Sequence, residues 1–126
     1  MKALNKAEEQ VMKYLWELEK GYLKDIVAQY PDPAPAYTTV STVVNVLVKK
    51  GFIGFETHGK SKEYSPLVAK EAYAKESLQG MVHTFFNDSP KQFASFFTQE
   101  SELSVEELKE LQDMIAAEIK KQQDNG

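Results

Sequence analysis

The residues of this sequence best suited to chemistry are short hydroxyl and amide side chains gathered in one stretch near its middle. The stretch YTTVSTVVNVLVKKGF covers residues 37–52. Such side chains both donate and accept hydrogen bonds, and they are short enough to let a backbone approach a groove closely. They suit bonding to the edges of DNA bases, with threonine methyl groups facing the methyl of thymine. The residues concerned are Thr38, Ser41, Thr42 and Asn45.

The same stretch is rich in β-branched residues, which favour strands, but its apolar positions follow a helical period. At about 100° per residue they fall within an arc of about 140°, with the polar residues opposite. A strand period of two would divide the valines between both faces. Lys49, Lys50 and Gly51 are typical of a helix end. We therefore predict a helix whose buried arc is Ala36, Tyr37, Val40, Val43, Val44, Leu47 and Val48.

The alternative is a merely threonine-rich exposed helix, and the charge distribution bears on this choice. The chain of 126 residues has a net charge of −4, and all its 15 basic residues are lysine. Residues 36–62 are nevertheless locally basic, with four lysines against Glu56 alone. This surplus favours a polyanion partner, although a solvated lysine-rich turn would look the same. The four lysines, which we expect to contact DNA phosphates, are Lys49, Lys50, Lys60 and Lys62.

Two helices and a hairpin are predicted around this central helix. Asn5 and Glu8 have the spacing of a capping box, and Gly21 is the expected stop of that first helix. A shorter helix covers about 22–30, and the prolines of 31–35 require a loop.

The segment FIGFETHGKSKEYSPL (52–67) alternates apolar and polar residues on both sides of Gly59, which predicts a β-hairpin. Three helices followed by a hairpin with lysines at its tip form a winged helix-turn-helix. We expect a mainly α protein with this DNA-binding domain at 1–66. Its third helix would enter the major groove, and the hairpin would rest on the backbone.

The second half predicts three more helices, a domain at 67–121 and a frayed tail at 122–126. Ser89 and Pro90 begin one helix, and Ser104 begins the last. Five of the seven phenylalanines lie within thirteen residues, too many for about sixty residues to bury. Pairing with a second copy would hide them, whereas a ligand cavity between helices is the alternative. The expected dimer core is Phe85, Phe93, Phe97, Leu108, Leu111 and Ile115.

Other functions find little support in the sequence. There is no cysteine, and His58 and His83 lack the paired ligands of a metal site, so we expect no metal and no cofactor. No nucleophile–base arrangement or phosphate-binding glycine loop occurs, so we expect neither an enzyme nor a small-molecule substrate. No apolar run approaches the about 18 residues of a membrane span, so we expect no membrane insertion and a cytoplasmic location.

Several motifs resemble the penicillinase-repressor family, the BlaI/MecI/CopY-type bacterial winged-helix transcription repressors. The likeness lies in KAEEQVMKYLWE, KDI, AYTTVSTVVNVLVKKGFI and KEYSPLV, and it is strong over the N-terminal two-thirds of the chain and loose over the remainder. Its most specific parts are Thr39-x-x-Thr42, the following Leu47-x-Lys49-Lys50-Gly51, and Tyr64-x-Pro66-Leu67. The resemblance implies a homodimer on a pseudo-palindromic operator in double-stranded DNA. It also implies that Thr39 caps or anchors the recognition helix, beside base-facing Ser41, Thr42 and Asn45.

The sequence departs from the family pattern at several points. Ser41 stands where relatives often carry a long basic residue, and Val46 where they often carry arginine. These changes imply a different operator or weaker binding. The cysteines of the copper-responsive branch are absent.

The resemblance also implies release by a membrane sensor protease that cuts the dimerisation domain at an Asn-Phe bond. Here the corresponding bond is Ser95-Phe96, and Phe96 serving simply as core is the alternative. A different class of function also stays open. In it the winged helix binds a protein partner through Tyr14, Trp16 or the phenylalanine-rich half and never contacts DNA.

Overall fold

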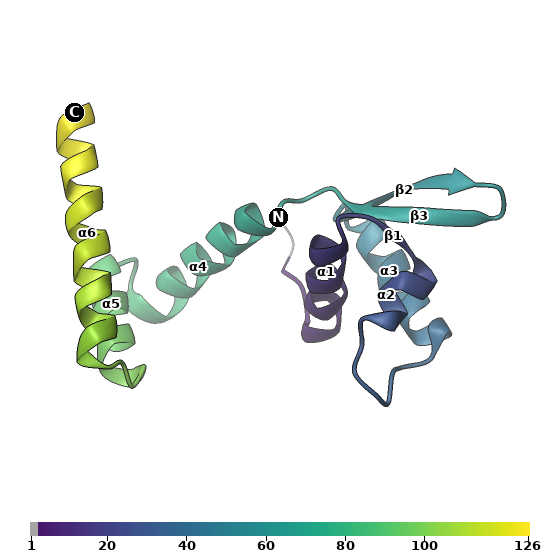
Figure 1. The fold of residues 1–126 in the computed structure, drawn as a ribbon, viewed down its shortest axis with the longest axis horizontal. Helices are drawn as coiled ribbons and strands as arrows, with labels where there is room; N and C mark the ends of the chain where they lie inside the picture. The colour runs from purple at the N-terminus through teal and green to yellow at the C-terminus, as the bar shows by residue number, and fades with distance from the viewer. Residues whose placement is uncertain (1–2) are drawn as a thin grey trace. The chain divides into compact units, whose positions relative to one another are not determined.

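The structure is a computed structural model that describes residues 3–126 (Figure 1). Its contacts divide the chain into two compact units, one reaching Leu78 and the other beginning at Gln79. The elements of the described residues are, in chain order, α1 (Lys6–Leu18), β1 (Gly21–Tyr22), α2 (Leu23–Ala28), α3 (Tyr37–Lys49), β2 (Ile53–His58), β3 (Ser61–Pro66), α4 (Lys70–Phe86), α5 (Pro90–Glu100) and α6 (Val105–Asn125).

The first unit is built around one hydrophobic core to which α1, α2, α3 and the hairpin all contribute. The helices place apolar residues three and four positions apart on their inner faces, as an amphipathic helix requires. Burying these side chains supplies the main driving force for the fold. The fully buried residues are Val11, Met12, Leu15, Ile26, Val40, Val44, Leu47, Phe52 and Ile53.

The N-terminus of α1 has the predicted capping box. The Glu8 backbone N–H donates to Asn5 Oδ1 at 2.8 Å, and the Asn5 N–H donates to Glu8 Oε1 at 2.9 Å. The predicted stop at Gly21 is wrong, because α1 ends at Leu18 and Glu19 takes the positive φ of 69°. Gly21 is instead a strand residue, where an added Cβ would lie 3.2 Å from the Cβ of Asp25.

The stretch that begins at Tyr37 is helical as far as Lys49, as its periodicity predicts. After α3, Gly51 adopts a φ of 84°. The Phe52 N–H donates to the Leu47 carbonyl at 2.9 Å, and the Gly51 N–H donates to that of Val48 at 3.1 Å. These two bonds, with Leu47 and Phe52 both buried, form a Schellman motif. The β-branched residues are tolerated because α3 buries Val40 and Val44 and half-buries Val43 and Val48. Ala36 and Tyr37, predicted in the same buried arc, are exposed at the start of the helix.

The predicted hairpin is formed by β2 and β3, which we call the wing (residues 53–66; Figure 1). His58 pairs with Ser61 across a two-residue turn, and Gly59 supplies the φ of 65° that such a turn needs. The two residues of β1 pair with β3, so the sheet has the order β1-β3-β2. This third strand was not predicted, because two residues are too short for an alternating pattern to be visible.

The segment after the wing makes hydrogen bonds to α1 and so belongs to the first unit. The Trp16 indole N–H donates to the Val68 carbonyl at 2.9 Å, and the Tyr73 hydroxyl donates to Glu9 at 2.9 Å. Val68 and Tyr73 also pack on the core. The boundary between the two units therefore falls within α4, after Leu78. The predicted domain boundary lies after residue 66.

The second unit consists of the end of α4, α5 and α6. Ser89 caps α5 through the Gln92 N–H, and Ser104 and Glu107 form the predicted capping box of α6. Helix α6 continues to Asn125, through most of the segment expected to be a frayed tail. None of residues 79–126 is buried.

Together, the three helices and the wing are the predicted winged helix-turn-helix, followed by further helices in a mainly α protein. Within the described part of the chain, every helix is too short or too polar to span a membrane.

Candidate nucleic-acid interface

Helix α3 presents the predicted polar face outward. Val40, Val44 and Leu47 are buried, whereas the polar residues lie on the opposite side of the helix. Among the latter, Thr38, Thr39, Thr42 and Asn45 are exposed and Ser41 is half-buried. The result is a helix whose outer surface is made of short hydrogen-bonding side chains.

Two of these side chains differ in how free they are to bind a partner. The Thr42 hydroxyl donates to the Thr38 carbonyl at 2.9 Å, which leaves its oxygen as an acceptor. Within residues 3–126 the Asn45 amide has no partner, so its carbonyl oxygen and NH₂ group are both available. An amide of this kind matches the donor and acceptor that adenine displays in the major groove.

Thr39 does not cap α3, so of the two roles that the resemblance implies only anchoring of the helix stays a prediction. The N-cap is Ala36, and among the described residues no side chain caps the free N–H groups of the first turn. Thr39 lies three positions inside the helix on the exposed face, next to Val46 in the helical projection. Val46 is itself 37% exposed, an apolar side chain within a polar surface.

The two lysines at the end of α3 have different environments. Lys49 is exposed, but the Lys50 ammonium lies 2.8 Å from Oε2 and 2.9 Å from Oε1 of Glu8. Glu8 is only 4% exposed. The hydrogen bond from Lys50, helped by the Asn5 N–H, holds the pKa of the Glu8 carboxyl below its ordinary value although burial opposes this. The Lys50 ammonium is thus paired with Glu8 within the first unit.

The wing carries the other two predicted lysines. Lys60 lies in the turn, and the Lys62 ammonium lies 4.5 Å from the centre of the Phe55 ring. Both line a groove of about 670 Å³, and the exposed Lys24 of α2 lines it as well. Lys24 was not predicted, since only the pairing of β1 with β3 brings the start of α2 beside the wing.

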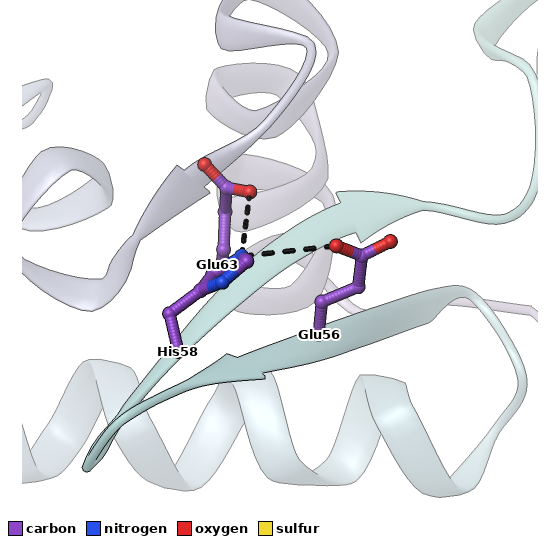
Figure 2. Close-up of side chains that lie close together, drawn as sticks. All are labelled: Glu56, His58 and Glu63. Carbon is purple, nitrogen blue, oxygen red and sulfur yellow. Dashed lines mark ion pairs between the residues drawn. The ribbon is translucent and has the colours of Figure 1, made fainter.

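One face of the wing brings together Glu56, His58 and Glu63, as Figure 2 shows. The prediction that His58 lacks neighbouring ligands is therefore wrong. The signal was present in the sequence, because Glu56 and His58 are two apart and a hairpin closed at Gly59 places Glu63 opposite Glu56. His83 has one carboxylate neighbour, Asp88, at 2.9 Å.

Comparison with known proteins identifies a family for this chain. The family described as penicillinase repressor matches residues 4–117. The chain belongs to the penicillinase-repressor family. The penicillinase repressor of Bacillus licheniformis is 22% identical over 113 residues, which cover 89% of this chain and 88% of that protein. A solved CopR repressor structure is 32% identical, covers 53% of this chain and 99% of its own, and gives a TM-score of 0.45.

Membership in this family makes the chain one of the DNA-binding transcription repressors of bacteria. The two relatives described above are named as repressors. The outer face of α3 and the lysines of the wing are accordingly the candidate DNA-contacting residues of this family member.

The residues expected to form a dimer core lie in the second unit. Phe85 is 73% and Ile115 62% exposed. Phe97 and Leu108 are also exposed, and Phe93 and Leu111 are half-buried. Phe93 stacks on Phe97 with ring centres 6.1 Å apart. Ser95 and Phe96, the candidate release site, lie within α5, with Phe96 54% exposed.

Proposed function

We propose that this family member represses transcription as a homodimer bound to a pseudo-palindromic operator. In this proposal α3 of each copy enters the major groove, and the wing lies on the adjoining backbone. The observation that carries it is the outer face of α3, where short polar side chains stand opposite the buried Val40, Val44 and Leu47. An ordinary solvent-facing helix would carry glutamate, lysine or glutamine at these positions.

Base recognition is assigned to Thr38, Thr39, Ser41, Thr42 and Asn45. Asn45 is the strongest candidate, because its amide has no intramolecular partner within residues 3–126. The threonine methyl groups and the exposed Val46 add apolar contacts of the kind that recognise thymine. Ser41 and Val46 add no positive charge, so specificity rests on short-range contacts more than on charge.

Phosphate binding is assigned to Lys49, Lys60 and Lys62, and we add Lys24 because it lines the same groove as the wing lysines. Lys50 is left out of this set, since its ammonium is bonded to Glu8. Phosphate contacts of this kind position the protein and carry no sequence information. The wing lysines therefore determine the affinity for DNA and its salt dependence, whereas α3 determines which DNA sequence is recognised.

Dimerisation is assigned to the second unit, because that unit has no buried residue of its own. Several of its large apolar side chains, such as Phe85 and Ile115, are more than half exposed. Between α5 and α6 lies an open apolar groove of about 410 Å³, in which a helix could bind. Its lining includes Val105, Leu108 and Ile115. A second copy is the partner we infer, since it would present the same apolar surface.

Proteolytic release is a further part of the proposal. The Ser95-Phe96 bond lies in the middle of α5, so α5 must open locally before a protease can bind the chain in extended form. Production together with a membrane protease encoded beside this chain should then yield a fragment ending at Ser95. An intact chain under those conditions would remove proteolysis from the mechanism and leave DNA binding untouched.

Gel-shift titration of the full chain against its own upstream region tests the central proposal. We expect nanomolar to sub-micromolar binding, with an affinity that falls steeply between about 50 and 200 mM salt. Scrambled DNA of the same length and composition is the control. Equal binding to both DNAs, or no binding to either, would support the alternative in which the winged helix binds a protein.

A further inference from the structure

The hairpin register gathers three potential metal ligands on one face of the wing. Glu56 and His58 alternate onto the same face of β2, and Glu63 of β3 lies directly opposite Glu56. His58 Nε2 lies 3.4 Å from Glu63 Oε1 and 3.7 Å from Glu56 Oε2. Dashed lines mark these two pairs in Figure 2. One ligand atom from each residue lies within 4.8 Å of the other two.

These distances are close to those of a metal site. Bonds of about 2.0–2.2 Å from an ion to nitrogen and oxygen place neighbouring ligands about 3.0–3.6 Å apart. The two distances from His58 already lie at or just above this range. The Glu56 side chain is 81% exposed and therefore has room to move inward by the remainder.

The electrostatics of the hairpin provide an independent reason for a cation at this place. Like charges directly opposite one another on antiparallel strands are destabilising, and Glu56 and Glu63 form such a pair. Lys62 pairs with Thr57 on the other face, where its ammonium lies over Phe55. Among residues 3–126, no lysine forms an ion pair with either carboxylate.

Two of the three ligands are held in place by β1. Tyr22 of β1 pairs with Glu63, and its ring meets the His58 ring edge-on with centres 6.3 Å apart. The Glu63 side chain is only 22% exposed, compared with 49% for His58. The imidazole and one carboxylate are therefore partly oriented before any ion binds, which reduces the entropy lost on binding.

We propose that Glu56, His58 and Glu63 bind one divalent transition-metal ion of the zinc class on the wing. One imidazole and two carboxylates suit Zn²⁺, Co²⁺ or Ni²⁺, whereas Mg²⁺ and Ca²⁺ prefer oxygen ligands alone. Water would complete the coordination of this exposed site.

The ion would also strengthen DNA binding, a consequence that rests on the function proposed above. The wing carries Lys60 and Lys62 against Glu56 and Glu63, so its formal charge is zero with His58 neutral. A bound divalent ion would neutralise the face that carries Glu56 and Glu63 and would make the wing as a whole doubly positive. By linkage, DNA would raise the affinity for the metal by the same factor.

Calorimetric titration of the full chain with ZnCl₂, without DNA, tests the site itself. We expect one ion per chain. Because loss of even an outer-shell partner weakens metal binding about 10–100-fold, His58→Ala and Glu63→Gln should each weaken it at least about tenfold. His83→Ala is the matched control, since within residues 3–126 Asp88 is the only carboxylate paired with His83. No binding at millimolar Zn²⁺, or equal binding by wild type and His58→Ala, would overturn the site.

A gel shift with and without Zn²⁺ tests the consequence separately. Zn²⁺ should tighten operator binding by the wild type and not by His58→Ala. Unchanged operator binding by a zinc-loaded wild type would overturn the coupling. A chain that binds Zn²⁺ in the calorimeter but binds no DNA would contradict the proposed function and leave the metal site standing.

Discussion

Lys50 and Lys49 are adjacent lysines with different expected roles. Lys50 is bonded to a buried carboxylate, and Lys49 faces solvent. Lys50→Met leaves the Glu8 charge without its main partner, which should lower the free energy of unfolding by about 2–3 kcal/mol. Urea denaturation measures this, with Lys49→Met expected to change stability by less than about 0.5 kcal/mol. Equal effects of the two variants would contradict the internal role of Lys50.

The same pair gives a pH dependence. Because the pKa of Glu8 is lowered in the folded state, the Glu8 carboxyl binds fewer protons there, on average, than it does in the unfolded chain. The stabilisation is complete above the ordinary value of 4.5 and is lost as the pH falls from there through the lowered value. The stability difference between wild type and Lys50→Met should therefore narrow below pH 4.5. A difference that stays constant to lower pH would exclude the ion pair as its cause.

Asn45 is the residue at which sequence recognition is best tested. If its amide makes a two-point contact with a base, Asn45→Ala should reduce discrimination between operator and scrambled DNA by about 1–3 kcal/mol. Binding to scrambled DNA should change little, because phosphate contacts are intact. Paired gel-shift titrations give this ratio, and a variant that weakens equally on both DNAs would place Asn45 outside base recognition.

At the scale of elements, local patterns predicted the helices well. The 3.6-residue period of α3 outweighed its β-branched composition, and Gly51 ended it as expected. The capping boxes at Asn5 and Ser104 were equally clear, because each depends on residues only three apart. Such features are decided within one or two turns of chain.

What the sequence could not predict depends on contacts between distant segments. β1 exists because Gly21 and Tyr22 pair with β3, forty residues further on. Glu19 takes a positive φ because the chain must turn into that strand, although a glycine lies two residues later. The Lys50–Glu8 pair joins residues 42 apart, so it is not visible in the local sequence. The prediction that Lys50 contacts DNA phosphates therefore rested on its charge alone. The three-residue cluster on the wing is a different case, because the register of a hairpin closed at Gly59 could have been worked out from the sequence.

The wing is expected to act as a phosphate-binding element. Lys60→Ala and Lys62→Ala should each weaken binding to operator and scrambled DNA alike, and each should reduce the slope of log K against log salt by about one. Lys121→Ala, near the end of α6 in the other unit, is the charge-matched control. A wing variant that changes discrimination between DNAs while keeping the salt slope would show base recognition by the wing.

At the scale of the whole molecule, the first unit has a core and the second does not. A unit without buried residues lacks the main source of folding free energy. We expect the chain to have twice its mass of 14.3 kDa in sedimentation velocity. Ile115→Lys places a charge in the proposed interface and should weaken the dimer by about 2–4 kcal/mol. Asp113→Lys, about 160° around α6 from Ile115, should leave it dimeric.

Dimerisation should in turn determine operator affinity, because joining two DNA-binding units makes the second contact intramolecular and raises avidity about 10²–10⁴-fold. Ile115→Lys should therefore lose most of its affinity for a two-half-site operator. Its affinity for an isolated half-site should equal that of the wild type, since α3 and the wing are unchanged. Changing the half-site spacing by half a helical turn should weaken the wild type and not the variant. An Ile115→Lys monomer that binds the whole operator as tightly as the wild type would show that one copy suffices, and would refute the dimeric repressor.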